Sequence, residues 1–256
     1  MRRGETMTAI ALPRQPHSAW LERLRSIRLG LGARGAVGLG LGRSRVSAVA
    51  VDWWEAGGAT GAVAVYQPKG AASLAASYSN LANPGTYDAA PGVAPTWASG
   101  TGWTFAGTQY LKSGITPADG YSVVVRVSNY AQAYTASFGT RASSTARFYI
   151  MPNTINGGGS SIFAYASIEQ GTGSGTSVVN GVLAMTKDAG YKDGVIITAI
   201  SSTWVGAAGG TVYIGARDRA GAADYYMTGD IQAIAIYNTT LTAPQVAAVS
   251  AAMAAL

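Results

Sequence analysis

The chain contains no cysteine and a single histidine, His17. Without thiols it can form no disulfide, no thiolate metal site and no cysteine nucleophile. Because His17 lies close to the N-terminus, a Ser-His-Asp triad or a histidine-ligated zinc site has no candidate in the rest of the chain. No segment reads G-x-x-x-x-G-K-[ST], so this type of phosphate-binding loop is also excluded. Together these absences remove most routes to catalysis.

Charged residues are scarce, and the few present are unevenly distributed. They make up 12% of the chain, against 48% hydrophobic residues, which is not the composition of a disordered chain. Residues 1–50 carry nine Arg and two Glu, a net charge of +7, whereas residues 51–256 carry nine basic and ten acidic residues, a net charge of −1. The basic part suits a polyanion or an acidic partner surface. The rest offers no electrostatic case for binding nucleic acid.

The basic N-terminal region contains a short amphipathic pattern that starts at Ser18. Apolar and basic side chains share it, namely Trp20, Leu21, Leu24, Ile27 and Leu31 with Arg23, Arg25 and Arg28 between them. A Gly-rich run over residues 29–42 follows, and no run reaches the roughly 18 apolar residues of a membrane span. We predict a basic, Gly-rich arm over residues 1–52 and one domain over residues 53–256.

Four interpretations of this arm stay open. Docking to an assembly partner, which we favour, would use Trp20, Leu24, Ile27 and the three arginines Arg23, Arg25 and Arg28. The helix could instead lie on a membrane surface, or the arm could be an unstructured tail without a role. A signal peptide is the fourth interpretation: Ala48-Val49-Ala50 resembles a cleavage site, but Arg34 interrupts the apolar core that such a peptide needs.

From Trp53 onward, short apolar runs alternate with turn residues. Many short strands separated by turns predict an all-β sandwich or barrel. The expected strands are Ala62–Tyr66, Trp103–Ala106, Tyr110–Lys112, Tyr121–Ser128, Tyr134–Gly139, Arg147–Met151, Ile162–Ile168, Ser177–Met185, Val195–Ala199, Thr211–Gly215 and Asp230–Tyr237. Gly-rich segments, such as Lys192-Asp-Gly194, predict turns between them.

The last two elements have distinct patterns. In the strand Asp230–Tyr237, alternation would place Ile231, Ala233, Ala235 and Tyr237 on one face and Gln232, Ile234 and Ile236 on the other. Because both faces are largely apolar, this strand is expected to be central and covered on both sides. Thr242 and Gln245 then form a capping-box pattern, which predicts a short helix that folds back on the sandwich through Val246, Val249 and Met253.

Several of these segments, in order, resemble laminin-G-like domains of the concanavalin A-like lectin/glucanase superfamily. Trp103–Gly107 with Gln109–Leu111 is similar to the family's "F-x-G…Y-L" hairpin, Gly190–Gly194 to its "Y-x-D/N-G" turn, and Thr211–Gly215 with Gly229–Val246 to its closing strands. The stretch from Ala64 to Trp97 resembles phage and metagenomic proteins that carry this domain. The resemblance implies a jelly-roll β-sandwich of two antiparallel sheets, with a role in binding or virion architecture and often a glycan ligand.

The same resemblance raises glycoside hydrolysis and calcium binding. Hydrolases of this fold need two carboxylates, carried in an "E-x-D-x-x-E" strand. This chain has only four Glu, and neither Glu55 nor Glu169 has an acid two residues away. We therefore predict no enzymatic activity and no catalytic residue. For calcium, Asp88, Asp218 and Asp224 are the nearest candidates, but their spacing gives no support, so no cofactor or metal is predicted.

A glycan site needs an exposed aromatic face and planar polar groups that reach sugar hydroxyls. The segment Arg217–Tyr226, read as a loop, offers Arg217, Asp218, Tyr225 and Tyr226, and Trp204 is a further candidate. The competing interpretation is that these rings complete the edge of the core. The aspartates Asp218, Asp224 and Asp230 are expected to be solvated.

The leading hypothesis is a structural or adhesive binding module of a virion or another exterior assembly, anchored by the arm and with a glycan as a further ligand. A secreted carbohydrate-binding lectin and a degenerate glycoside hydrolase are the alternatives. The expected localisation is a virion or the extracellular space.

Overall fold

Two β-sheets stack face to face in the computed structural model, which describes residues 51–155, 159–204 and 209–256. The described residues belong to one compact unit, Val49–Leu256. The predicted arm helix and its docking residues lie outside the described part, and the division at residue 52 stays a prediction. No helix among the described residues is long and apolar enough to cross a membrane.

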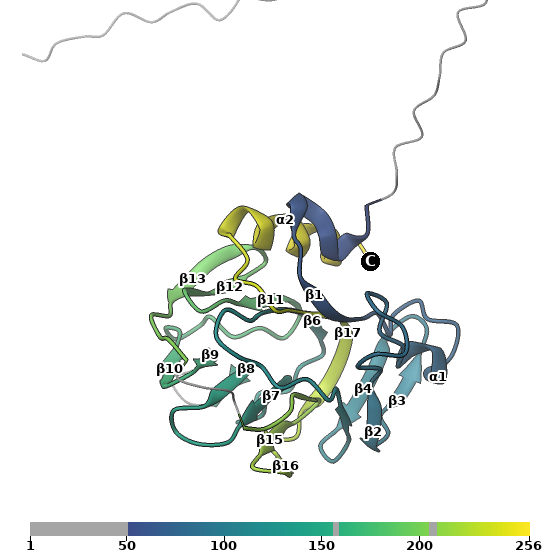
Figure 1. Cartoon of the computed structure of the whole chain (residues 1–256). Helices are drawn as coiled ribbons and strands as arrows, with labels where there is room; N and C mark the ends of the chain where they lie inside the picture. The colour runs from purple at the N-terminus through teal and green to yellow at the C-terminus, as the bar shows by residue number, and fades with distance from the viewer. Residues whose placement is uncertain (1–50, 156–158, 205–208) are drawn as a thin grey trace, which may run out of the picture. The chain divides into compact units, whose positions relative to one another are not determined.

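The first sheet has eight strands in the order β13-β12-β11-β6-β17-β4-β3, with β1 also paired to β17. Its members are β1 (Ala62–Tyr66), β3 (Thr96–Ala98), β4 (Gly102–Ala106), β6 (Ser122–Ser128), β11 (Gly181–Met185), β12 (Ala189–Lys192), β13 (Val195–Ala199) and β17 (Thr228–Tyr237). All its strand pairs are antiparallel. The long strand β17 lies at its centre (Figure 1).

The second sheet has nine strands, in the order β10-β9-β8-β7-β14-β5-β2 with the hairpin β15–β16 beside β7. Its members are β2 (Ala90–Val93), β5 (Tyr110–Lys112), β7 (Phe138–Arg141), β8 (Arg147–Thr154), β9 (Ser160–Tyr165), β10 (Ile168–Gly171), β14 (Tyr213–Ile214), β15 (Arg217–Arg219) and β16 (Ala222–Asp224). Its pairs are antiparallel except for one parallel contact, Asp218 with Thr140. The fold is therefore an antiparallel β-sandwich, as predicted.

The main core lies between the sheets and draws on both of them. Buried side chains such as Trp103 and Ile234 from the eight-stranded sheet join Phe148, Phe163 and Ile214 from the nine-stranded sheet. The sheets pack closely where β12 meets β9, since a Cβ atom added at Gly190 would lie 2.7 Å from the ring of Phe163.

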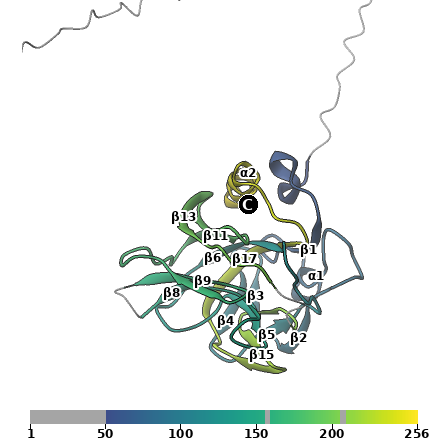
Figure 2. The same cartoon turned by 60° about the vertical axis from the view of Figure 1, so that its left-hand side comes forward.

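The outer face of the eight-stranded sheet is covered by helix α2 (Ala243–Ala254), with the 3-10 helix η1 (Trp53–Gly58) beside it (Figures 1 and 2). The predicted stripe Val246, Val249 and Met253 is fully buried here. The helix begins as its capping pattern indicates, since the N–H of Thr242 donates to Oε1 of Gln245 at 2.9 Å. The predicted C-terminal lid is thus confirmed. Helix α1 (Leu74–Ser77) is a single turn.

Strand β17 is central and covered on both sides, as predicted, but the predicted division of its faces was wrong at Ile231 and Gln232. A β-bulge shifts the register between Ile231 and Ala233. Ile231 therefore joins Ile234 in the core between the sheets, whereas Ala233 packs under α2. An extra residue at a bulge reverses the alternation on one side of it, and simple periodicity cannot show where that happens.

Two other predictions need correction. The segments at Trp103 and Tyr110 do not form a hairpin, because β4 pairs with β3 and β17 in one sheet while β5 pairs with β2 and β14 in the other. The run Ile162–Ile168 is two strands, which join at the turn Ala166-Ser167. The Asp193-Gly194 turn was correct: both residues have positive φ, 49° and 82°, as a two-residue hairpin turn requires.

Candidate functional site

The segment Arg217–Tyr226, expected to be a loop, forms the hairpin β15–β16. Ala220 and Gly221 make its two-residue turn with φ angles of 51° and 94°, which matches the twist of the paired strands. Oδ1 of Asp218 accepts the N–H of Gly221 at 2.7 Å, and its Oδ2 accepts the N–H of Thr211 at 3.0 Å. Asp218 is only 2% exposed and holds the hairpin, so the expectation that it is solvated was wrong, while its role as a ligand residue stays a prediction.

Arg217 lies at the centre of the site and is completely buried. Its register partner across the hairpin is Asp224, whose oxygens accept Nε at 2.9 Å and Nη2 at 2.7 Å. The guanidinium carbon lies 5.0 Å from the ring centre of Tyr149 and 3.9 Å from that of Tyr225. Burial alone would lower the pKa of Arg217, but the hydrogen bonds and charge of Asp224 outweigh it and raise the pKa. The cation is thus held by one carboxylate and two ring faces.

Glu169, on β10, connects two of the neighbouring tyrosines. Its Oε2 accepts the hydroxyl of Tyr149 at 2.6 Å, and its Oε1 accepts that of Tyr134 at 3.3 Å. Nε of Arg147 lies 3.8 Å from Oε2. Burial, followed by the nearby Glu169, raises the pKa of both tyrosines, so their hydroxyls stay protonated and donate at neutral pH. We call Tyr134, Tyr149, Glu169, Arg217, Asp224 and Tyr225 the Arg217 cluster.

The cluster lies on the outer face of the nine-stranded sheet. Strand register runs from Lys112 through Tyr213, Gly139, Tyr149 and Ala164 to Glu169, one position per strand. Side chains of neighbouring residues on each strand point the other way, into the core. Pairing of adjacent strands therefore brings together residues that are far apart in sequence.

Parts of the cluster reach solvent. The rings of Tyr134 and Tyr225 are half-buried and meet edge to face, with centres 5.3 Å apart. The side chains of Asp224 and Glu169 are 25% and 27% exposed. Within the described part of the chain, Nη1 of Arg217 has no hydrogen-bond partner. Parts of two tyrosine rings and two carboxylates thus reach the surface around a buried cation.

Tyr226 belongs to a separate group of tyrosines. Its ring meets that of Tyr110 at 6.1 Å, Tyr110 stacks on Tyr213 at 5.1 Å, and Nζ of Lys112 lies 5.9 Å from the Tyr213 ring. The structure therefore places Tyr225 and Tyr226 in different groups. This separation does not come from the alternation of an extended strand, because Tyr225 has a φ of 52°.

Trp204 does not present a binding face. It is 5% exposed, and its ring centre lies 5.4 Å from that of Tyr165 and 6.2 Å from that of Phe148, inside the main core. Here the core interpretation of the ring holds, because the intersheet space needs a large side chain at this end.

The aspartates considered for calcium have other partners. Oδ1 of Asp88 accepts the N–H groups of Asn80 and Gly85, at 2.7 and 3.2 Å. Asp218 and Asp224 are engaged in the hairpin. Among the described residues, no group of three or more His, Cys, Asp or Glu side chains is placed to hold a metal ion.

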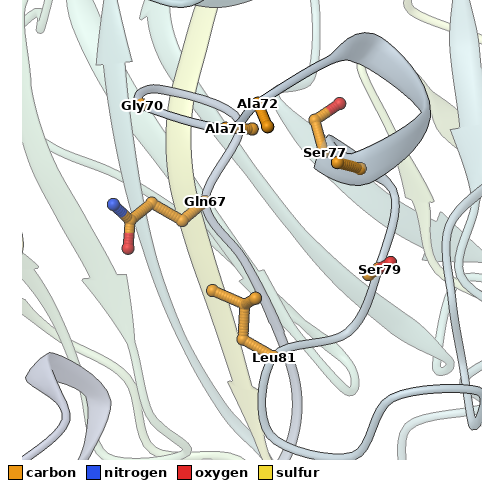
Figure 3. Close-up of a pocket in the computed structure, with 8 residues that line it drawn as sticks. Gln67, Gly70, Ala71, Ala72, Ser77, Ser79 and Leu81 are labelled. Atoms are coloured by element: carbon orange, nitrogen blue, oxygen red, sulfur yellow. The ribbon is translucent and has the colours of Figure 1, made fainter.

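A hollow of about 280 Å³ beside α1 offers little to a ligand. Gln67, Ser77 and Leu81 lie around it, together with small alanines (Figure 3). Ser77 already donates to the carbonyl of Leu74 and accepts from Nε1 of Trp103. Gln67 accepts from Nε1 of Trp53 and donates to the carbonyl of Lys69. The side chains of Ser77 and Gln67 are therefore already used in hydrogen bonds within the fold.

The sequence interpretation found Arg217 and Tyr225 but missed Tyr134, Tyr149 and Glu169. Only Glu169 was noted at all, as an acid without a second acid nearby. Tyr149 and Glu169 lie on other strands and Tyr134 lies in the segment before β7, and their approach depends on strand register that no local pattern records.

Comparison with known proteins adds information on the fold alone. The sequence matches no family model and none of the curated proteins. Domain 4 of the GH43 extracellular arabinanase AbnA from Geobacillus stearothermophilus, in complex with arabinotriose, is 18% identical with a TM-score of 0.51, over 74% of this chain and 98% of that domain.

Two further structures are less similar. A Trypanosoma rangeli sialidase mutant is 17% identical (TM-score 0.47; 75% of this chain, 33% of that one), and the CBM40 of a Ruminococcus gnavus sialidase, bound to α2,3 sialyllactose, is 15% identical (TM-score 0.39; 52% and 83%). The chain also spans only 27% of the length of the NanB sialidase from Streptococcus pneumoniae. The likeness to the arabinanase domain supports the two-sheet β-sandwich fold alone.

Proposed function

We propose that this chain is a non-enzymatic module that binds carbohydrate through the Arg217 cluster. The observation that carries the proposal is the pair of half-buried rings: Tyr134 bonds to the Glu169 carboxylate, and Tyr225 packs on Arg217, which Asp224 binds. Sugar rings have apolar C–H faces that pack on aromatic rings and hydroxyls that bond to planar polar groups. The arabinanase domain of the same fold is in complex with arabinotriose, which supports this ligand class.

The cluster is organised before any ligand arrives. Arg217 is fixed by two hydrogen bonds and two rings, and Glu169 by two tyrosine hydroxyls. Fixed side chains lose little conformational freedom on binding, which favours affinity. Both carboxylates are engaged in holding the cluster, whereas glycoside hydrolysis needs one as an acid and the other facing the sugar. This arrangement favours binding over bond cleavage.

The test uses the full chain on a glycan array, followed by calorimetry with each glycan bound. Tyr225→Ala should weaken binding by about tenfold or more, since it removes a ring and uncovers Arg217. Tyr226→Ala is the matched control, because the neighbouring tyrosine belongs to the other group, and it should leave binding unchanged. An empty array, or the opposite order of the two variants, would refute the proposal. Release of reducing ends from a bound glycan would refute its non-enzymatic part.

A second candidate function rests on the charge distribution. The net charge of +7 in residues 1–50, beside a nearly neutral domain, supports a laminin-G-like module that its arm anchors to a virion or another exterior assembly. A chain that lacks residues 1–50 should then fold and bind glycans but fail to enter the assembly. Unchanged incorporation would contradict the anchoring role. A secreted lectin would need no such partner.

A further inference from the structure

A second hollow, of about 360 Å³, lies on the outer face of the eight-stranded sheet, next to the end of α2. Strands β6, β11 and β17 and the turn between β12 and β13 line it, with Arg126, Ser128, Asn180, Asp193, Gln232 and Ala254 among the lining residues. Its volume is within the range of small-molecule sites, roughly 300–1,000 Å³. It lies on the opposite sheet from the Arg217 cluster.

The hollow arises where the helix stops covering the sheet. Along β6, Val124 packs under α2, but Arg126 and Ser128, which share its face, are polar and only partly buried. The bulge in β17 turns Gln232 to the same face as Ala233. The same strands thus present an apolar surface to the helix and a polar surface beyond it.

Three polar side chains in the hollow, Gln232, Asn180 and Asp193, are each fixed by one group and leave another unused. Nε2 of Gln232 donates to Ser128 at 3.1 Å, and Oδ1 of Asn180 accepts the N–H of Asn129 at 3.0 Å. Oδ1 of Asp193 accepts the N–H of Val182 at 2.9 Å. In the part of the chain that the structure describes, the other amide atoms of Gln232 and Asn180 and Oδ2 of Asp193 have no hydrogen-bond partner.

Arg126 completes the set. Its Nη1 donates to the main-chain oxygens of Met253 and Leu256, at 2.9 and 2.8 Å, which holds the guanidinium at the rim of the hollow. The lining therefore offers donors from Arg126 and Asn180 and acceptors from Gln232 and Asp193. One positive and one negative side chain balance each other, and no aromatic ring lines the hollow.

We propose that this hollow binds a small, neutral, polyhydroxylated ligand, about one sugar unit in size. Hydroxyl groups both donate and accept, so one such ligand can use the free donors and acceptors together. A charged ligand would be attracted by one of Arg126 and Asp193 and repelled by the other, which favours a neutral ligand. The site is independent of the Arg217 cluster, and binding at both would join two glycans through one domain.

The test follows amide resonances of the full-length chain by NMR during titration with D-galactose, L-arabinose and D-glucose. N-acetylneuraminic acid and D-glucosamine serve as anionic and cationic probes. At least one neutral sugar should shift the amides of Gly181 and Asp193 and the side-chain amide of Gln232, with the charged probes weaker. Shifts near Tyr134 and Tyr225 report on the other site in the same spectra, so failure of either proposal can be recognised separately.

Gln232→Leu keeps the side-chain volume but removes the amide, and it should weaken binding at the hollow about tenfold. Gln170→Leu, on the edge strand of the other sheet, is the matched control and should leave these shifts unchanged. If thermal unfolding shows that Gln232→Leu is not folded, Asn180→Ala replaces it. The proposal is overturned if no neutral sugar shifts these amides, if only a charged probe does, or if the folded variant binds as the parent does.

Discussion

Replacement of Asp224 by alanine should destabilise the domain more than most surface substitutions do. The change leaves the Arg217 guanidinium, 0% exposed in the native structure, without the carboxylate that binds both Nε and Nη2. Breaking a buried ion pair from one side costs about 3–5 kcal/mol. Because the Asp224 side chain is 25% exposed, water can enter where it was, and we expect a loss at the low end, about 3 kcal/mol.

A double-mutant cycle isolates the pair. Arg217→Met keeps an apolar stem between Tyr149 and Tyr225 and leaves Asp224 close to water, so it should cost only about 1–2 kcal/mol. With both changes no buried charge is left unpaired, and the double variant should be more stable than Asp224→Ala alone. The coupling energy should be about 2–3 kcal/mol. Arg219→Met is the control, because Arg219 lies 3.9 Å from Asp224 but is 66% exposed, and it should cost less than about 0.5 kcal/mol.

Urea unfolding monitored by tryptophan fluorescence gives the free energies, and calorimetry gives the melting temperatures. A loss of about 3 kcal/mol corresponds to a decrease in Tm of roughly 6–12 °C for a domain of this size. Additive effects of Asp224→Ala and Arg217→Met would refute the reasoning, since they would mean that the guanidinium is well solvated without its partner. So would an Asp224→Ala variant as stable as the parent.

Three further predictions concern the fold. Burial raises the pKa of five tyrosines in the folded state far above the ordinary value of about 10. Because the unfolded chain loses these protons first, the free energy of unfolding should fall steeply above pH 10, by about 1.4 kcal/mol per pH unit for each tyrosine. Urea unfolding at a series of pH values measures this, and a free energy that stays constant to pH 11 would contradict it. These tyrosines are Tyr66, Tyr130, Tyr149, Tyr165 and Tyr237. Gly190→Ala should cost about 1–3 kcal/mol in urea unfolding, because its Cβ would lie 2.7 Å from the Phe163 ring, while Gly171→Ala, with open space around it, should be tolerated. Asn80→Ala should cost about 2–4 kcal/mol by the same measurement, because the buried amide bonds to four main-chain groups, and exposed Asn238→Ala should have little effect; equal losses would contradict this role.

Local sequence patterns predicted much of this fold, because strands and turns are set by neighbouring residues. Ala62–Tyr66, Tyr110–Lys112 and Val195–Ala199 were predicted with the bounds that the structure has. The Asp193-Gly194 turn and the capping residues of α2 were identified because each motif has one strongly preferred geometry. Short strands without alternation, such as β2 and β12, gave no such signal.

Sheet membership could not be predicted in the same way. Between Ala106 and Tyr110 the chain crosses from one sheet to the other, although three intervening residues also suit a hairpin. The distinction depends on which partner strands are available, here β17 for β4 and β14 for β5. Those partners lie more than 100 residues away in the sequence.

The candidate site shows the same limit. Arg217 and Tyr225 could be found because one hairpin carries both, whereas Tyr149 and Glu169 reach Arg217 through strand pairing from β7 to β10. The burial of Trp204 and Asp218 could not be read from the sequence, because exposure cannot be inferred from residue type: a tryptophan beside a Gly-rich segment can fill a core, and an aspartate can hold a turn.

The two outer faces of the sandwich are covered differently, and this difference agrees with the two places where we propose ligand binding. The eight-stranded sheet presents Val124, Ala184 and Ala235 to α2, and the helix buries this apolar surface. What the helix leaves uncovered is polar, around Arg126 and Gln232. The nine-stranded sheet instead carries charged and aromatic side chains, covered in part by the β15–β16 hairpin. Buried apolar surface stabilises the fold, whereas polar groups that are fixed and partly exposed can bond to a ligand. We therefore expect ligands at the Arg217 cluster and at the hollow around Gln232.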